Sequence, residues 1–188
     1  MHTLKIISSS TRPGRKGPAI AQWIYEKAKG HTEFDVELLD LAVIRLPFMD
    51  EPEHPRLKKY QHEHTKRWSA TIESADAFIM VTPEYNFGMP ATLKNALDFL
   101  FREWAKKPVG FISYGGMSGG IRSVQMLKQV VTTLSMMPLT ESIAIPFFTK
   151  HINEHGLFQG DETLEKSAAV LLKELEHWAT ALKTLRSQ

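Results

Sequence analysis

The chain has 188 residues, 43% hydrophobic and 23% charged, which is the composition of an ordinary soluble globular protein with room for one substantial core. Its 23 basic and 21 acidic residues nearly cancel to a net charge of +2, which argues against nucleic acid as a partner because no strong basic excess is present. Without cysteine it has no disulfides or thiolate metal sites, and without a long apolar run or a signal-peptide core we expect a cytoplasmic protein with no membrane partner.

Short apolar segments alternate with helical patterns along the chain. The predicted strands are residues 4–7, 34–39, 77–81, 109–114 and 143–145. The predicted helices are residues 20–28, 56–74, 91–104, 124–134 and 164–185, and residues 41–55 are expected to form a loop. This alternation predicts an α/β fold in one domain, residues 1–188. We expect a doubly wound, five-stranded parallel sheet of order 2-1-3-4-5 with helices on both faces.

The loop after the first strand combines hydroxyl groups with basic side chains. Residues 8–11 supply hydroxyl donors, Arg12 and Arg15 supply guanidinium groups, and the first 25 residues contain no acidic side chain. Gly17 lets the backbone approach a ligand, and the helix that follows directs its positive end to the same place. These features favour a phosphate monoester, although the loop has neither a Walker nor a G-x-G-x-x-G pattern. A serine-rich turn that only caps the helix is the alternative.

Two further loops follow strands at the same predicted edge of the sheet. The loop with Glu84, Tyr85, Asn86 and Phe87 could form a wall for a flat, partly polar ligand, or it could be a packed connection with both aromatic rings in the core. The loop over residues 113–120 has four glycines, which suit close approach to a flat ligand and tight strand-to-helix packing equally well. Convergence of these loops at the switch point between strands one and three favours FMN as the ligand.

These motifs resemble those of the NAD(P)H-dependent FMN reductase family, which includes flavodoxin-like quinone, azo and chromate reductases. The resemblance covers roughly residues 3–150 and lies in Ser10-Thr11-Arg12-Pro13-Gly14-Arg15, in Pro83-Glu84-Tyr85-Asn86 with Leu93-Lys94-Asn95-Ala96-Leu97-Asp98, and in Ser113-Tyr114-Gly115-Gly116 with Ser118-Gly119-Gly120. Ser9 is a departure, since many members have glycine before the serine.

The resemblance implies an FMN site and no metal. The implied FMN-binding residues are Ser10, Arg12, Arg15, Gly17 and Pro18 for the phosphate, Pro83, Glu84, Tyr85, Asn86 and Phe87 for the ribityl chain and ring, and Ser113, Tyr114, Gly115 and Gly116 beside the ring. No protein side chain is expected to be catalytic, because flavin N5 carries the hydride.

The implied reaction passes two electrons from NADPH or NADH to quinones or similar small acceptors, such as azo dyes, chromate or free flavin, by a ping-pong mechanism. The family also implies a homodimer or a tetramer, with the helix after Gly120 as a candidate surface. The main alternative is a flavodoxin-type electron carrier with no nicotinamide site. Flavodoxins are usually strongly acidic, whereas this chain carries a net charge of +2. A non-catalytic nucleotide-binding module is the other alternative.

Overall fold

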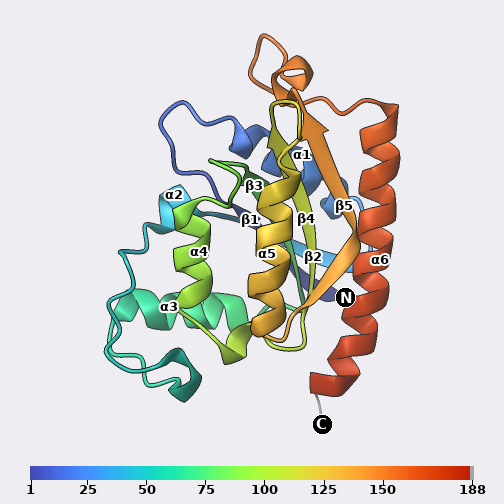
Figure 1. Cartoon of the computed structure of the whole chain (residues 1–188). Coiled ribbons are helices and arrows are strands. Elements are labelled where there is room, and N and C mark those ends of the chain that lie inside the picture. The colour runs from blue at the N-terminus through green and yellow to red at the C-terminus, as the bar shows by residue number, and fades with distance from the viewer. Residues whose placement is uncertain (187–188) are drawn as a thin grey trace.

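The computed structural model describes residues 1–186 and contains one five-stranded sheet in which all neighbouring strands are parallel (Figure 1). The strands are β1 (His2–Ser8), β2 (Phe34–Asp40), β3 (Ala77–Pro83), β4 (Pro108–Gly115) and β5 (Met137–Pro146). Their order is β2-β1-β3-β4-β5, which confirms the predicted doubly wound topology. Residues 187–188, the end of the predicted domain, lie outside the described residues.

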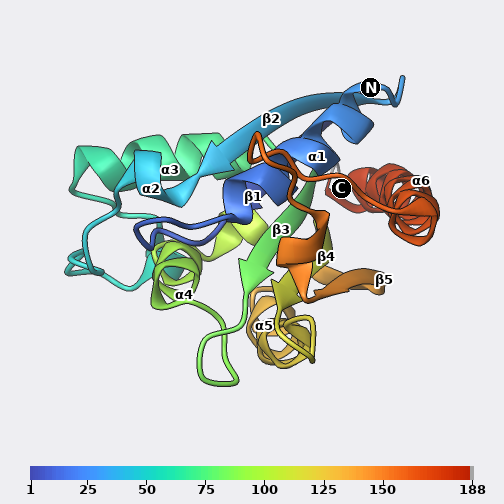
Figure 2. The same cartoon turned by 90° about the horizontal axis from the view of Figure 1, so that it is seen from above.

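Helices cover both faces of the sheet. They are α1 (Gly17–Lys29), α2 (Leu41–Ile44), α3 (Glu63–Glu73), α4 (Ala91–Asp98), α5 (Ile121–Thr133) and α6 (Glu162–Arg186). One core lies between the sheet and helices α1 and α6, and the other lies between the sheet and helices α3, α4 and α5. Figure 2 shows α4 and α5 on the opposite side of β3 and β4 from α1 and α6. Among residues 1–186, no helix combines the length and the apolar content needed to cross a bilayer.

The central strands are apolar because both of their faces are covered. Every residue of β3 is buried, and so are residues 4–8 of β1. In β4 only the last residue, Gly115, is partly exposed. These continuous apolar runs explain why the strands could be predicted from the sequence alone.

The register of the strands brings their carboxyl ends to one edge. Ser8 at the end of β1 pairs with Asp40 of β2 and Val81 of β3, and Pro83 of β3 pairs with Tyr114 of β4. The loops that follow these strands therefore emerge together, at the top of Figure 1. This edge holds the loops that the sequence predicts to converge.

The predicted helix over residues 56–74 is wrong in extent. A single 3-10 turn (Pro55–Leu57) comes first, and it ends where Lys58 adopts a left-handed conformation with φ 56°. The chain becomes helical again only at α3. The predicted loop over residues 41–55 also contains the short helix α2, because the carboxylate of Asp40 accepts a hydrogen bond from the Ala42 N–H at 3.0 Å and caps it.

The helix predicted over residues 91–104 ends early, since α4 stops at Asp98. Trp104 lies in a separate 3-10 turn (Arg102–Trp104) and is still fully buried, with its indole N–H bonded to the Leu97 carbonyl at 3.2 Å. The helical spacing identified a buried side chain correctly but not the backbone that carries it.

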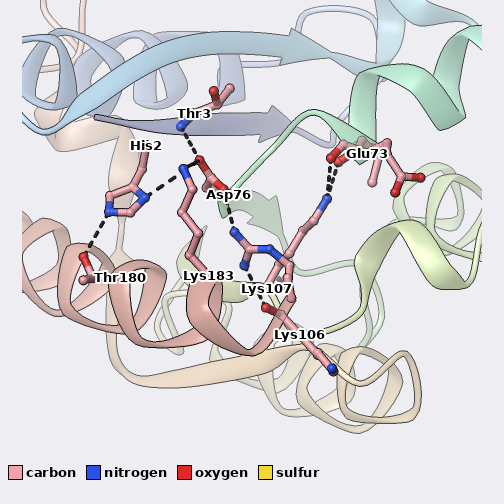
Figure 3. Close-up of polar contacts among 10 residues, drawn as sticks. His2, Thr3, Glu73, Asp76, Lys106, Lys107, Thr180 and Lys183 are labelled. Carbon is pink, nitrogen blue, oxygen red and sulfur yellow. Dashed lines mark hydrogen bonds and ion pairs between the residues drawn. The ribbon is translucent and has the colours of Figure 1, made fainter. Parts of the chain in front are cut away.

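A cluster of polar contacts at the opposite edge of the sheet attaches the C-terminal helix (Figure 3). The Asp76 carboxylate accepts hydrogen bonds from the Thr3 N–H at 3.1 Å, from Lys183 at 3.2 Å and from Arg186 at 2.5 Å. His2 bonds Thr180 of α6 at 3.0 Å. These contacts join the start of β1 and the start of β3 to α6, far from the loops at the carboxyl edge.

Candidate functional site

A cavity of about 370 Å³ opens at the carboxyl ends of the strands. Its wall comes from the loops after β1, β3 and β4 and from the segment after β5: Ser10, Arg12, Gly14, Arg15, Lys16, Pro83, Glu84, Tyr85, Tyr114, Gly115, Gly116, Phe147, Phe148 and Thr149. The volume lies in the range of small-molecule sites. The three loops therefore converge on one cavity, as predicted, and the segment after β5 lines it as well.

α1 begins beside this cavity, because its N-cap residue, Lys16, lines the wall. Pro18 has no N–H and the Ala19 N–H bonds the Lys16 carbonyl at 3.1 Å, so Gly17 carries the first N–H of the helix that is left for a ligand. Lys16, at the N-cap, makes no side-chain cap bond, and the first turn contains Pro18 but no acidic residue. Such a terminus attracts an anion. A Cβ atom on Gly17 would collide with the Tyr114 hydroxyl, so this close approach of strand end and helix start requires glycine. Burial raises the pKa of Tyr114, and its hydroxyl therefore stays protonated as a hydrogen-bond donor.

The two arginines of the first loop differ in their partners. Arg15 donates to both carboxylate oxygens of Asp40, at 2.5 and 2.7 Å, and to the Ser10 carbonyl at 2.8 Å. Within residues 1–186, neither Arg12 nor Lys16 has an ion-pair partner, although both line the cavity. The charge of Arg15 is already matched, so the uncompensated positive charge of the wall is that of Arg12 and Lys16.

The loop after β3 is a two-residue β-hairpin. Tyr85 and Gly88 exchange backbone hydrogen bonds of 2.9 and 3.0 Å, and the two tip residues, Asn86 and Phe87, have φ values of 49° and 68°. Tyr85 is 37% exposed and Phe87 is 69% exposed, so neither ring lies in the core, and the alternative of a packed connection is wrong. The Tyr85 hydroxyl lies 2.7 Å from the Ser10 hydroxyl, which joins this hairpin to the first loop.

Of the glycines after β4, some serve strand-to-helix packing and others leave room for a ligand, the two roles that the sequence left open. Gly119 and Gly120 have positive φ, and a Cβ on either would collide with the backbone of β5 or β4, so they serve strand-to-helix packing. Gly116 has no atom within 4 Å of where its Cβ would lie, and it lines the cavity with Gly115. Gly116 therefore leaves space that a ligand can fill.

The segment after β5 also lines the cavity, although it was not among the predicted site residues. Phe147 has a left-handed backbone with φ 48°, its N–H bonds the Gly116 carbonyl at 3.0 Å, and its ring is 47% exposed at the cavity. Phe148 packs edge-on against Tyr114 at 5.0 Å between ring centroids. The available signal was a pair of aromatic residues directly after the fifth strand, at the edge where the other loops gather. Lys16 also lines the cavity; it belongs to the basic first loop but was not among the predicted FMN-binding residues.

Some of the predicted site residues do not line the cavity. Gly17 and Pro18 begin α1 behind the first loop, Asn86 and Phe87 form the hairpin tip, and Ser113 is buried within β4. The remaining predicted residues share the wall.

A doubly wound parallel sheet with a cavity at its switch point, lined by basic side chains without ion-pair partners among residues 1–186, is the arrangement of α/β nucleotide-binding proteins. The chain belongs to the family described as NADPH-dependent FMN reductase, whose model matches residues 3–150. It is therefore a member of a family of oxidoreductase enzymes.

Three comparisons illustrate this membership. An NAD(P)H-dependent FMN reductase of Schizosaccharomyces pombe is 42% identical over 166 residues, covering 79% of this chain and 82% of that protein. An NAD(P)H:quinone oxidoreductase of Solanum tuberosum is 34% identical over 110 residues, covering 54% of this chain and 55% of that one. The solved structure of FerB, a flavoenzyme NAD(P)H:(acceptor) oxidoreductase from Paracoccus denitrificans, has a similar fold with a TM-score of 0.77 and 20% identity, covering 96% of this chain and 98% of that one.

Proposed function

We propose that this chain binds FMN in the cavity at the carboxyl edge and passes two electrons from NADPH or NADH to quinones or similar small acceptors. The observation that carries the proposal is that one cavity is lined both by Arg12 and Lys16, whose charges are unmatched among the described residues, and by Gly115 and Gly116, which have no side chains. A relative named as a quinone oxidoreductase supports the class of acceptor.

The phosphate of FMN fits the end of the cavity formed by the first loop. Because Asp40 already neutralises Arg15, the side chains of Arg12 and Lys16 supply two positive charges, which match a phosphate dianion. The Ser10 hydroxyl and the Gly17 N–H at the start of α1 would donate to the phosphate oxygens. Arg15 contributes by holding the Ser10 carbonyl and so the shape of the loop.

The flavin ring fits between the hairpin and the loop after β4. Tyr85 would contact its edge, and Gly115 and Gly116 would lie against it without side chains in the way. Bound flavin would supply the hydride-carrying atom, so no side chain need act as nucleophile, acid or base. The protein residues would orient the ring and would leave one of its faces open to donor and acceptor in turn, and such a shared face would give ping-pong kinetics.

We also propose a homodimer with its surface on α5, whose Ile121 is 50% exposed and whose Met126 is 42% exposed. Exposed apolar side chains on one helix suit an interface between two copies. Sedimentation equilibrium of the protein, compared with the Met126→Lys variant, tests this: the parent should be a dimer or tetramer and the variant should dissociate more readily. A monomeric parent would contradict it.

The function is tested by adding FMN to the purified protein and then NADPH without oxygen. Rapid bleaching of the bound flavin, followed by recovery of its absorbance when a quinone is added, is expected. Binding of FMN without rapid bleaching would favour a flavodoxin-type carrier. Failure to take up FMN would favour a non-catalytic module.

A further inference from the structure

We infer that Arg122, which lies on α5 outside the cavity wall, is a positioning residue that holds the two loops on the ring side of the flavin site. The inference rests on the proposed function, because its effect is stated for flavin binding. It concerns the contacts that Arg122 makes to Glu84 and Phe87 of the hairpin and to Ser118 of the loop after β4.

The contact to Glu84 is the strongest of these. The Glu84 carboxylate, 8% exposed, accepts from Arg122 Nε at 2.7 Å and lies 2.5 Å from Arg122 Nη2. It also accepts from the Arg122 backbone N–H at 3.0 Å. The N-cap of α5 is Gly120, which has no side chain to cap the helix, so a carboxylate from a different loop does so.

A positively charged side chain in the first turn of a helix is unfavourable because the helix dipole is positive there. α5 nevertheless begins Ile121-Arg122 and has no acidic residue in its first turn. The nearly buried carboxylate of Glu84 offsets this cost and explains an arginine at this position. Conversely, Glu84 without Arg122 would lose the only cation that pairs with it among the described residues.

The same guanidinium fixes the tip of the hairpin. Its central carbon lies 3.9 Å from the centre of the Phe87 ring, a cation–π contact. Phe87 is 69% exposed and has a left-handed backbone, so core packing does not hold it. The third contact, from Arg122 Nη2 to the Ser118 hydroxyl at 3.0 Å, attaches the loop after β4 to the same group. In Figure 2 the loop after β3 runs between α4 and α5, beside the start of α5.

These contacts all lie on the ring side of the cavity. On the phosphate side, Arg15 holds the first loop through Asp40 and the Ser10 carbonyl, contacts that involve no residue of the hairpin. Loss of Arg122 should therefore loosen the walls beside the ring and leave the phosphate end intact. General damage to the fold, in contrast, would weaken the binding of flavin and of phosphate alike.

The experiment compares three probes, namely FMN, riboflavin and inorganic phosphate, with the full-length protein and its Arg122→Ala, Arg122→Lys and Gln125→Ala variants. Flavin affinities are measured by fluorescence titration and phosphate affinity by ³¹P NMR. Arg122→Ala should weaken FMN and riboflavin by about tenfold or more, since charge-assisted contacts of this kind are lost, and change phosphate affinity by less than about twofold. Arg122→Lys should recover part of the loss, because lysine keeps the charge without the planar fork. Gln125→Ala, an exposed position one turn along α5, should match the parent.

Glu84→Gln removes the same ion pair by changing the partner of Arg122. It should also weaken riboflavin binding and leave phosphate affinity nearly unchanged, so it provides the test if Arg122→Ala folds poorly. Unchanged riboflavin affinity in these variants, or equal loss of riboflavin and phosphate, overturns the positioning role. A parent protein that binds phosphate but no flavin overturns the proposed function instead.

Discussion

Arg15 and Asp40 form a two-pronged ion pair, with Nη1 2.5 Å from Oδ1 and Nη2 2.7 Å from Oδ2. Burial by itself would raise the pKa of Asp40, but the hydrogen bonds from Arg15 and from the Ala42 N–H, together with the charge of Arg15, hold that pKa below its usual range. The pair joins the end of β2 to the first loop and removes one positive charge from the proposed phosphate site.

Asp40→Asn should therefore change stability and anion affinity in opposite directions. Asparagine still accepts from the Ala42 N–H, so α2 keeps its cap, but the free energy of unfolding should fall by about 1 kcal/mol as the half-buried pair is lost. With Arg15 unmatched, affinity for inorganic phosphate should rise several-fold. Urea unfolding and ³¹P NMR measure the two effects, and unchanged or weaker phosphate binding would count against the charge argument.

Arg12→Ala should weaken FMN by a factor of roughly 10 to 100, since a charge-assisted hydrogen bond contributes about 1.5–3 kcal/mol. Riboflavin, which lacks the phosphate, should bind the variant as it binds the parent. Fluorescence titration of both flavins measures this, with Arg102→Ala as a control for losing an exposed arginine outside the cavity. Equal loss for FMN and riboflavin would remove Arg12 from the phosphate site.

Phe147 combines a strained, left-handed backbone with a ring that lines the cavity, so its substitution should affect both stability and acceptor binding. A left-handed conformation costs a side-chain-bearing residue roughly 1–2 kcal/mol and costs glycine little. Phe147→Gly should therefore be more stable than Phe147→Ala by about 1 kcal/mol, while both variants, without the ring at the cavity, should raise the KM for quinone several-fold. Thermal unfolding and steady-state kinetics measure the two effects. Equal stability of the two variants would contradict the strain, and an unchanged KM would contradict the role of the ring.

Asp76 makes the C-terminal helix sensitive to acid. Burial alone would raise its pKa, but hydrogen bonds from Thr3 and Lys183 and the charges of Lys183 and Arg186 lower it below the ordinary value of 3.8. A carboxyl group with a lowered folded-state pKa stabilises the fold above its unfolded pKa, and that contribution is lost as the pH falls through the folded-state pKa.

Asp76→Asn should accordingly lower the free energy of unfolding at pH 7 by on the order of 1–2 kcal/mol and lower it much less at about pH 3. Urea unfolding at the two pH values measures the difference. The acidic group Glu154, which is exposed in the loop after β5, offers a control in Glu154→Gln. A loss that is the same at both pH values would show that the Asp76 charge does not stabilise α6.

The sheet order could be predicted because the buried strands are continuous apolar runs and the alternation with helices is regular. The convergence of the three loops followed from that order, since parallel strands end at a common edge. The pairing of Arg15 with Asp40 could not be predicted, because it joins residues 25 positions apart whose side chains meet only in the fold. The same holds for Glu84 and Arg122, 38 positions apart.

The ends of helices and strands were less predictable than their order, and the fifth strand, predicted at residues 143–145, spans Met137–Pro146. Lys58 and Phe147 adopt left-handed conformations that their residue types do not indicate, and each changes the course of the chain. The role of Phe147 at the cavity depends on such a turn, which explains why the segment after β5 was missed.

Phosphate recognition by the first loop is tested most sharply by titrating the flavin-free protein with FMN, with flavin fluorescence as the readout. The titration is repeated with riboflavin and with the Arg12→Ala variant. We expect one FMN bound per chain, weaker binding of riboflavin by the parent, and loss of that preference in Arg12→Ala. An FMN affinity no greater than that for riboflavin, or a preference that survives Arg12→Ala, would contradict a phosphate site formed by the first loop.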